Sequence, residues 1–584
     1  MNAERLLQHF ERISEAPDAI PRLRRFILDL AVRGKLVEQD PNDEPAEELL
    51  KSIQAEKQWL LKVGRIRKEN LLPVIQDKEI PFELHKCWKW ARIGNVTLFT
   101  EYGTSQQSTN SGMGVPILKM GDIQNGGIRL GGQKTVPKNI NDLPTLFLDK
   151  FDLLYNRTNS ADLVGKTGIY LGENNSYTFA SYIIRIRCSL KSTNPLYLNL
   201  AMNAPYFRKT QIVPHLKQQC GQANVNGTVL KNMLIPLPPL AEQHRIVAKV
   251  DELMALCNEL EAARNKREIQ RDRLVAASLH GLNNGDVSPE PDRPTFEESA
   301  RFYFKQFPRL TTRLEHIKKL RQTILNLAVQ GKLVPQDPND EPAVELLKRI
   351  RAEKARLVKE GMIKGQLPLP PLELVEHPFA LPVNWMWTRL GEIGDWGAGS
   401  TPPRGNAEYY GDNITWLKSG ELGDSLALSG SEERVSNLAL QKCSFRLNQP
   451  GDVLIAMYGA TIGKLAILAE PAVTNQAVCG CTPFKGVFNK YLFLFLLSCR
   501  EDFHGQSEGG AQPNISKVKI VSSLFALPPH AEQHRIVAKV DELIALCDEL
   551  ETRLATTSAT HKKLLEATMQ EALNGYPERL KGSL

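Results

Sequence analysis

The stretch "AEQHRIVAKVDEL" at residues 241–253 decides the fold, because the same thirteen residues recur at 531–543. The likeness extends beyond them: residues 241–261 and 531–551 agree at 19 of 21 positions. A repeat of this fidelity indicates an internal duplication, and a fold assigned without it would be mistaken.

A second pair of repeated segments lies upstream of the first. Residues 30–57 match residues 327–354 at 23 of 28 positions. The two tryptophans of "WKWARIGNV", from residue 88, recur in "WMWTRLGEI", from residue 385. Each half of the chain therefore has the order front arm, body, back arm.

The two bodies have diverged much further than the arms. The island "ILKMGDIQNG" from residue 117 shares only 3 of 10 positions with "WLKSGELGDS" from residue 416. Uniform drift after duplication would not leave near-identical arms beside such different bodies. We infer that the arms share one task and that the bodies have two different tasks.

The back arms are predicted to be long helices. Pro238 and Pro239 stop the preceding chain and set a sharp helix start, and Gly281 and Gly575 are plausible stops after roughly 40 residues, or about 60 Å of helix. Apolar residues step by four and three, as in the seam of a coiled coil. The predicted seam and docking residues are Ile246, Val250, Leu253, Cys257 and Leu260, with Ile536, Val540, Leu543, Cys547 and Leu550.

The front arms are predicted to be helices as well, with Gly34 and Gly331 at their C-terminal caps. Two copies of each helix can pair antiparallel about a pseudo-twofold axis, which would place the first front arm beside the last back arm. The alternative is that these segments are core helices of an ordinary α-helical domain.

Composition limits the class of protein. The chain has 584 residues, 42% of them apolar, and 73 basic against 66 acidic residues leave a net charge of +7. This mild excess permits a polyanionic partner without requiring one. Nine cysteines lack paired metal or disulfide spacing, and we predict no metal site at Cys479 and Cys481. The N-terminus does not resemble a signal peptide, so we expect a soluble cytoplasmic protein.

The bodies contain short strand candidates, namely "FDLLYNRT", "SYIIRIRC", "GDVLIAMY" and "KLAILA". The predicted fold class is α+β, with two mixed α/β domains separated by long antiparallel coiled-coil helices in a pseudo-twofold repeat. Polar loops, "EYGTSQQSTNSGMG" from residue 101 and "GAGSTPPRGNAEYYGD" from residue 397, suit contact with bases and phosphates. They are equally compatible with solvated surface loops.

Two motifs resemble enzyme signatures but are incomplete. "SADLVGKTG" from residue 160 has the GKT of a P-loop, but Ser160 stands at the position of its first glycine. "NPLY" from residue 194 resembles the NPPY of adenine methyltransferases, but Leu196 replaces the second proline and no glycine-rich cofactor loop accompanies it. We therefore predict no catalytic residues and no cofactor bound by this chain.

The whole pattern strongly resembles the specificity subunits of type I restriction-modification systems. The resemblance rests on "LPLPPLAEQHRIVAKVDEL" with its leucine seam, on front arms of the "AVRGKLVPQD" type, and on "GSTPP…EYY…ITWLKSGEL", "AMYGATIGK" and "TNQAVCG" in the second body. It covers nearly the whole chain. The first body departs from the family pattern, with "GTSQQSTN" and "YNRTNSADLVGKTG" at the corresponding places.

This resemblance implies a non-catalytic DNA-recognition subunit. Two target-recognition domains would each read half of a split DNA site, while helical arms hold them apart and dock two modification subunits. Those subunits would bind S-adenosylmethionine and methylate adenine N6. Two restriction subunits would supply the ATP-driven translocase and the nuclease, and Mg is expected in the partner subunits as well. No membrane is implied.

The predicted domains are an N-terminal helical arm, a first recognition domain, a central helical spacer, a second recognition domain and a C-terminal helical arm: residues 1–79, 80–236, 237–377, 378–526 and 527–584. The predicted DNA-binding residues lie in the polar loops and at the strand ends: Thr104, Ser105, Gln106, Gln107, Lys119, Asn156, Arg157, Ser400, Thr401, Arg404, Asn406, Tyr409, Tyr410, Lys418, Asn475 and Gln476.

Two alternatives of other classes remain at this point. One is a self-sufficient methyltransferase or nuclease with an unrecognised site, which would turn over S-adenosylmethionine or cut DNA alone. The other is a coiled-coil adaptor, which would give no two-part, sequence-dependent footprint on DNA.

Overall fold

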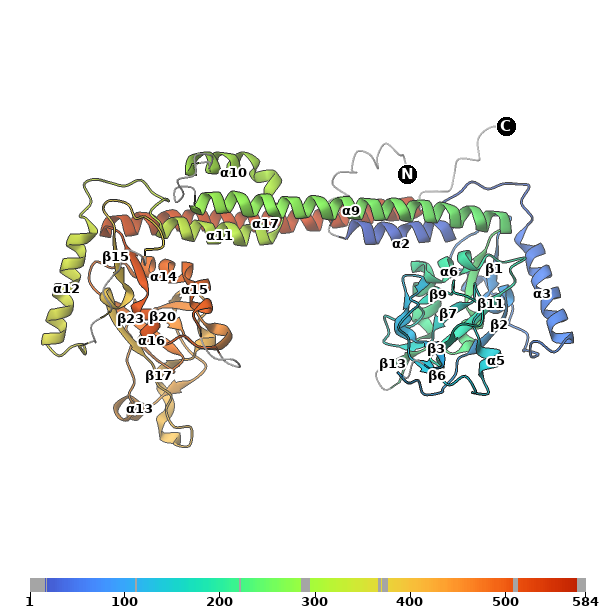
Figure 1. The fold of residues 1–584 in the computed structure, drawn as a ribbon, viewed down its shortest axis with the longest axis horizontal. Coiled ribbons are helices and arrows are strands. Elements are labelled where there is room, and N and C mark those ends of the chain that lie inside the picture. The colour runs from blue at the N-terminus through green and yellow to red at the C-terminus, as the bar shows by residue number, and fades with distance from the viewer. Residues whose placement is uncertain are drawn as a thin grey trace. The chain divides into compact units, whose positions relative to one another are not determined.

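The computed structural model describes residues 16, 18–110, 113–219, 222–284, 295–365, 369, 377–507 and 513–574. The chain divides into two compact units, each with one body and the arm helices packed on it (Figure 1). The first unit comprises Met1–Lys266 and Ser558–Leu584, and the second comprises Arg267–Thr557. Among the helices within these described ranges, none combines the length and the apolar character needed to cross a membrane.

The back arms are single helices of 45 residues, α9 (Leu240–Asn284) and α17 (His530–Asn574). Each begins directly after a proline pair, as the sequence predicted. Gly281 does not end α9, which continues for one more turn, because helical hydrogen bonding tolerates a single glycine at modest cost. Gly575 lies outside the described residues.

In the first unit, the front-arm helix α2 (Ala19–Val32) packs between α9 and the end of α17. Arg264 donates to the carbonyl oxygen of Ala16 at 2.9 Å, and Lys35 donates to that of Leu573 at 2.5 Å. Ala16 and Ala19 are buried against Leu565 of α17. The predicted packing of the first front arm beside the last back arm is therefore confirmed.

The second unit repeats this arrangement around α11 (Leu314–Val329). His316 of α11 lies 2.9 Å from Asp272 of α9, and Arg321 pairs with Glu551 of α17 at 3.1 Å. The helix α10 (Phe296–Leu310) covers the end of α9 and buries Tyr303 there. Two residues after each front-arm helix comes a glycine with positive φ, 66° at Gly34 and 72° at Gly331, which confirms the predicted caps.

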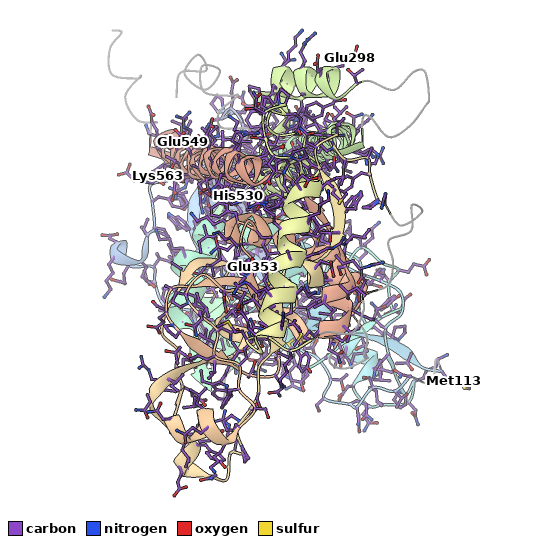
Figure 2. The ribbon with its side chains drawn as sticks, turned by 90° about the vertical axis from the view of Figure 1, so that its left-hand side faces the viewer. Met113, Glu298, Glu353, His530, Glu549 and Lys563 are labelled. Carbon is purple, nitrogen blue, oxygen red and sulfur yellow. The ribbon has the colours of Figure 1, made fainter. Side chains whose placement is uncertain are left out.

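A second front-arm helix follows in each half, α3 (Ala46–Lys62) and α12 (Ala343–Lys359). Lys57 of α3 donates to the carbonyl oxygen of Gly94 at 2.6 Å, and Lys354 of α12 makes the equivalent bond to Gly391 at 2.8 Å. Glu353 of α12, labelled in Figure 2, accepts a hydrogen bond from a body backbone N–H at 2.8 Å. These bonds fasten the front arm to its body.

The first body is a set of mixed sheets closed by the antiparallel pair β1–β14, which joins its two ends. Its largest sheet has the strand order β2-β11-β7-β9-β5-β4, and smaller sheets have the orders β10-β3-β6 and β12-β13-β8. The strands are β1 (Lys89–Arg92), β2 (Thr97–Tyr102), β3 (Val115–Leu118), β4 (Ile123–Gln124), β5 (Gly127–Ile128), β6 (Thr135–Val136), β7 (Leu153–Asn156), β8 (Thr158–Asn159), β9 (Thr167–Ile169), β10 (Thr178–Phe179), β11 (Ile183–Cys188), β12 (Lys217–Gln219), β13 (Gln222–Asn224) and β14 (Leu234–Leu237). The helices are α4 (Ile93–Val96), α5 (Leu143–Leu146), α6 (Pro195–Asn203), α7 (Pro205–Phe207) and α8 (Gly227–Asn232).

The second body is closed in the same way by the antiparallel pair β15–β24. Its sheets have the orders β16-β23-β20-β21-β18 and β19-β17-β22. The strands are β15 (Met386–Arg389), β16 (Gly394–Ala398), β17 (Tyr410–Leu417), β18 (Ser425–Leu428), β19 (Arg434–Val435), β20 (Val453–Ala456), β21 (Leu465–Leu468), β22 (Ala472–Thr474), β23 (Val478–Pro483) and β24 (Leu524–Leu527). The helices are α13 (Asn437–Lys442), α14 (Asn489–Ser498), α15 (Arg500–Gly505) and α16 (Lys517–Ser522).

The four predicted strand segments are confirmed as β7, β11, β20 and β21. The last strand of each body, β14 or β24, ends one residue beyond the predicted body ranges of 80–236 and 378–526. The α+β class with an internal repeat is confirmed.

The two bodies share one framework although their sequences differ. In each, a short strand pairs in parallel with the strand that ends just before Lys119 or Lys418. These pairs are β10 with β3 in the first body and β22 with β17 in the second. The N–H of Ala180 donates to the carbonyl oxygen of Leu118 at 3.0 Å, and that of Asn475 donates to Leu417 at 3.0 Å. Loops that differ in sequence are therefore carried on equivalent strand ends.

Candidate nucleic-acid interface

The predicted contact residues of the second body gather around one aromatic ring. Trp416 of β17 is almost fully buried, and its indole N–H donates to the carbonyl oxygen of Ser400 at 3.2 Å. The Arg404 guanidinium lies 5.5 Å from the Trp416 ring centre and 5.3 Å from that of Tyr410. The Lys418 ammonium lies 5.7 Å from the Trp416 ring. Two cations and an aromatic platform thus come from two stretches of chain, the loop that carries Arg404 and the end of β17.

Both cations are paired with one carboxylate that the sequence did not single out. Arg404 donates to Glu433 at 2.9 Å, and Lys418 donates to the other oxygen of the same group. Lys418 and Arg404 together hold the pKa of the Glu433 carboxyl below its usual value. Glu433 therefore occupies the position that a phosphate or another anion would take between these two cations.

The loop that carries Arg404 is anchored at Gly399. Its N–H donates to Val478 at 3.0 Å, and the N–H of Ser400 donates to Thr474 at 2.8 Å. A Cβ at Gly399 would lie 2.1 Å from the carbonyl oxygen of Thr474, so only glycine fits there. Beside this anchor, the hydroxyl of Thr401 donates to Gln476.

The side chains of Asn406 and Asn475 stabilise the turns in which they lie. The side chain of Asn406 accepts from the N–H of Glu408 at 3.1 Å, and that of Asn475 accepts from Ala477 at 3.2 Å. Tyr409 is half-buried against the cluster around Trp416. The structure thus brings together all the residues predicted for the second body.

The first body has the same anchor but different side chains. A Cβ at Gly103 would lie 2.2 Å from the carbonyl oxygen of Phe179, as at Gly399. The platform is absent, because Ile117 occupies the register position of Trp416. Lys119 reaches the hydroxyl of Ser108 at 2.8 Å. The predicted residues Ser105, Gln106 and Gln107 are all exposed in this loop.

Two predicted residues of the first body are part of the framework. Thr104 is buried, and its hydroxyl donates to Asp142 at 3.0 Å. Asn156 is buried at the end of β7, and its amide donates to the carbonyl oxygen of Leu163 at 3.1 Å. Neither side chain is presented at the surface, because strand pairing turns both of them inward.

Arg157, the next residue, is more accessible and lies with its guanidinium 4.8 Å from the ring centre of Tyr102. Tyr102 and Tyr182 are 43% and 52% exposed. Neither tyrosine was predicted from the sequence. The only sequence signal was that Tyr102 stands directly before the loop glycine. The sheet order explains its role, because β2 and β7 lie in one sheet with β11 between them, which brings Tyr102 and Arg157 together.

Comparison with known proteins identifies the family. The sequence profile described as type I restriction modification DNA specificity domain matches residues 86–271 and 382–557. The chain belongs to this family.

Two Escherichia coli relatives, matched over nearly their whole length, agree with this assignment. The specificity subunit of the type I restriction enzyme EcoAI from Escherichia coli is 34% identical over 575 residues, covering 95% of this chain and 94% of that protein. That of EcoEI, also from Escherichia coli, is 32% identical over 584 residues with the same coverage. The HsdS crystal structure from Thermoanaerobacter tengcongensis is 20% identical with a TM-score of 0.43, covering 85% of this chain and 99% of that one.

The chain is thus a specificity subunit with two target-recognition domains, the non-catalytic DNA-recognition component of a type I restriction-modification system. This assignment disfavours both the self-sufficient enzyme and the coiled-coil adaptor. From here the bodies are called the first and second recognition domains.

The predicted seam residues of the specificity subunit lie mostly inside its two units. Ile246, Val250 and Cys257 are buried with α2 and the first recognition domain in one core, and their counterparts Ile536, Val540 and Cys547 are buried likewise. Leu253 and Leu543 are half-buried. Leu550 is half-buried too, whereas Leu260 is 47% exposed. Side chains buried in this way join arm to body, and docking through them stays a prediction.

The P-loop-like and NPLY segments have structural roles. Every N–H from Leu163 to Thr167 donates to an acceptor of the protein, which leaves that loop without the amides that cradle a phosphate. Asn194 of NPLY caps α6 by accepting from Leu196 at 2.9 Å, and Tyr197 donates to Pro236 at 2.8 Å. Both segments are explained by local packing.

The cysteine pair of the second recognition domain is also internal. Cys479 and Cys481 lie two residues apart on β23, and both are fully buried. Burial raises the pKa of the Cys479 thiol to about 12, which opposes the thiolate form that binds metals. Within the described ranges, no group of three metal-ligating side chains comes together.

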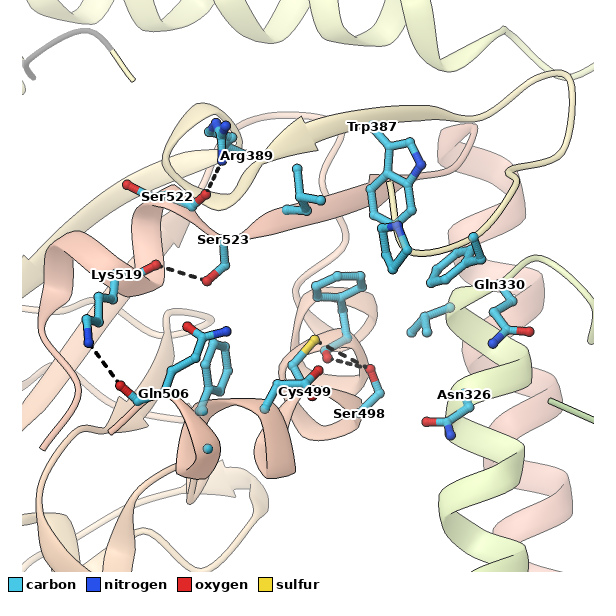
Figure 3. Close-up of a pocket in the computed structure, with 18 of the residues that line it drawn as sticks. Asn326, Gln330, Trp387, Arg389, Ser498, Cys499, Gln506, Lys519, Ser522 and Ser523 are labelled. Carbon is cyan, nitrogen blue, oxygen red and sulfur yellow. Dashed lines mark hydrogen bonds between the residues drawn. The ribbon is translucent and has the colours of Figure 1, made fainter. Parts of the chain in front are cut away.

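A pocket of about 900 Å³ lies in the second unit, away from the predicted contact loops (Figure 3). Phe379, Trp387 and Phe503 line it, and Lys519 closes one side by donating to the carbonyl oxygen of Gln506 at 2.9 Å. In the first unit, Tyr206 packs 5.5 Å from Phe82, the repeat counterpart of Phe379.

Proposed function

We propose that each recognition domain reads one half of an asymmetric, two-part DNA site. The observation that supports this proposal is a common framework carrying unlike polar surfaces, with the Arg404, Lys418 and Trp416 cluster in one copy and none in the other. A symmetric reader would give a palindromic site, because operator symmetry mirrors protein symmetry. Two unlike readers in one chain give two unlike half-sites.

The arms are proposed to set the spacing between half-sites and to dock two identical modification subunits. The repeat supports this proposal, since Leu256 and Leu546 are 47% and 48% exposed at equivalent positions of α9 and α17. Two restriction subunits complete the proposed complex. S-adenosylmethionine is assigned to the modification subunits, ATP and Mg to the restriction subunits, and no cofactor to this chain. The proposed location is the cytoplasm.

Domain exchange tests the proposal. Replacing residues 80–236 by the recognition domain of another specificity subunit is expected to change one half of the methylated sequence and to leave the other half and the gap unchanged. Methylation mapping of a host genome carrying the reconstituted system reports both halves and their spacing at once. A change in both halves, or in the gap alone, would refute the modular proposal.

Removing the charge of Glu433 is expected to strengthen DNA binding. Glu433→Gln releases Arg404 and Lys418 for phosphate, and an exposed ion pair of this kind contributes up to about 1 kcal/mol, or about a fivefold change in affinity. The slope of log affinity against log salt concentration should steepen by about one unit. Fluorescence anisotropy with a labelled duplex and the reconstituted complex measures both quantities.

The neighbouring substitution Glu432→Gln is the matched control. It removes the same charge from an exposed side chain that makes no ion pair with Arg404 or Lys418. Equal effects of the two variants would mean that net charge alone, and not the paired cluster, governs affinity.

A further inference from the structure

The two recognition domains carry different side chains at three equivalent positions on their strand ends. The N–H of Arg157 donates to Tyr182 at 3.1 Å, and that of Met457 donates to Ala477 at 2.8 Å. The carbonyl oxygen of Arg157 accepts from Val225 at 2.9 Å, as that of Met457 does from Ile515. Arg157 and Tyr182 of the first domain thus stand where the second domain has Met457 and Ala477.

The third position follows from the strand register. Tyr102 ends β2 one residue before Gly103, and Ala398 ends β16 one residue before Gly399. In the first domain, an arginine and two tyrosines therefore replace a methionine and two alanines. This exchange places a cationic and aromatic group where the second domain is apolar and small.

Arg157 differs from every other arginine of the first recognition domain. Arg92, Arg185 and Arg208 donate to backbone carbonyls, Arg187 is bonded to Asp152, and Arg129 pairs with Asp122 at 3.6 Å. Within the described part of the chain, no residue accepts a hydrogen bond from the Arg157 guanidinium, and its Nε is buried without a partner. The terminal N–H groups of this guanidinium are therefore left to donate to an acceptor outside the protein.

The guanidinium is also held in a fixed place. It stacks over Tyr102, whose hydroxyl accepts from the N–H of Gly227 at 2.7 Å. The backbone of Arg157 is bonded on both sides within the sheet. Such fixation lowers the entropy lost on binding and favours a ligand with acceptors at defined positions.

We propose that Arg157 reads a guanine in the half-site of the first recognition domain. Guanine presents O6 and N7 side by side in the major groove, and the fork of a guanidinium matches this pair. A phosphate would not require an arginine fixed on a tyrosine, since phosphate contacts carry no sequence information. This inference rests on the proposed function and names one base that the first domain recognises.

The test begins with the methylation motif of the wild-type complex. One half-site must contain a G·C pair at which Arg157→Lys relaxes the motif, with preference falling about 10- to 100-fold at that position. The other half-site and the gap should stay unchanged. Arg157→Lys keeps the positive charge, so a phosphate contact would survive it largely intact. Met457→Ala, at the equivalent position of the second domain, is the matched control and should leave the first half-site unchanged.

A second measurement leaves the protein unaltered. In duplexes with 7-deazaguanine at one position at a time, the wild-type complex should lose affinity at one guanine of the first half-site, and the Arg157→Lys complex should not lose it. The inference is overturned by a half-site without such a guanine, or by a uniform loss across all sequences. An unsplit methylation motif would instead contradict the proposed function itself.

Discussion

Replacing Gly399 by alanine is expected to remove sequence discrimination by the second recognition domain. The added Cβ would lie 2.1 Å from the carbonyl oxygen of Thr474 and 2.4 Å from that of Asn475. The backbone cannot move away without breaking the hydrogen bonds of Gly399 to Val478 and of Ser400 to Thr474. Overpacking of this kind costs about 1–3 kcal/mol, so preference for the second half-site should fall by about 10- to 100-fold. Binding to duplexes with base changes in each half-site measures the loss.

Two other glycines provide controls for this result. Gly405 lies in the same loop, and a Cβ there would meet no atom within 4 Å, so Gly405→Ala should behave like wild type. Gly103→Ala should transfer the defect to the first half-site, because its Cβ would lie 2.2 Å from the carbonyl oxygen of Phe179. If Gly399→Ala retained full discrimination, the anchor would not set the conformation of the loop.

The arms were predictable because their pattern is local. Prolines, glycine caps and a four-three apolar step are read along one segment, and a second copy confirms them. The reason for the near-identity of the back arms was less accessible. Gln243 accepts from the N–H of Asn194 at 2.8 Å, and Arg245 pairs with Asp43 at 2.6 Å. The second copy makes the same contacts, from Gln533 to Phe488 and from Arg535 to Asp340. Each copy of "AEQHR" therefore fastens the back arm to its body and to the front arm, which accounts for the fidelity of these residues.

The contact residues were less predictable because strand pairing decides them. Thr401 and Gln476 are 75 positions apart, and they meet only because β22 lies beside β17. Thr104 and Asn156 have the right chemistry for DNA, but their strands turn them inward. Glu433 showed no pattern along the chain, and the place of Tyr102 directly before Gly103 was too weak a signal to assign it a role. Their roles depend on neighbours that only the fold brings close. Glu433 lies between two cations, and Tyr102 lies beneath Arg157.

Truncating Trp385 should destabilise the second unit more than any loop change. Trp385 is buried at the joint between arm and body, and its indole N–H donates to Glu532 of α17 at 3.0 Å. Trp385→Ala is expected to lower the free energy of unfolding by about 3–5 kcal/mol. Trp385→Phe keeps most of the packing but removes a donor to a buried carboxylate, at a cost of about 1.5–3 kcal/mol. Urea denaturation followed by circular dichroism measures both changes.

The pH dependence of unfolding shows whether the Trp385–Glu532 hydrogen bond causes the loss of stability. Burial raises the pKa of Glu532 above its ordinary value of 4.5, while the bonds from Trp385 and Gln336 oppose the rise. Because the unfolded chain ionises first, the contribution of this group to stability falls as pH rises from about 4.5 through the raised pKa. Trp385→Phe removes one of the bonds that oppose the rise in the pKa of Glu532, so in this variant the decrease in stability should extend to higher pH. Glu532→Gln should abolish the decrease. Trp88 and Glu242, bonded at 2.8 Å, offer the same comparison in the first unit. Equal pH profiles for wild type and Glu532→Gln would place the origin of the stability in ring packing alone.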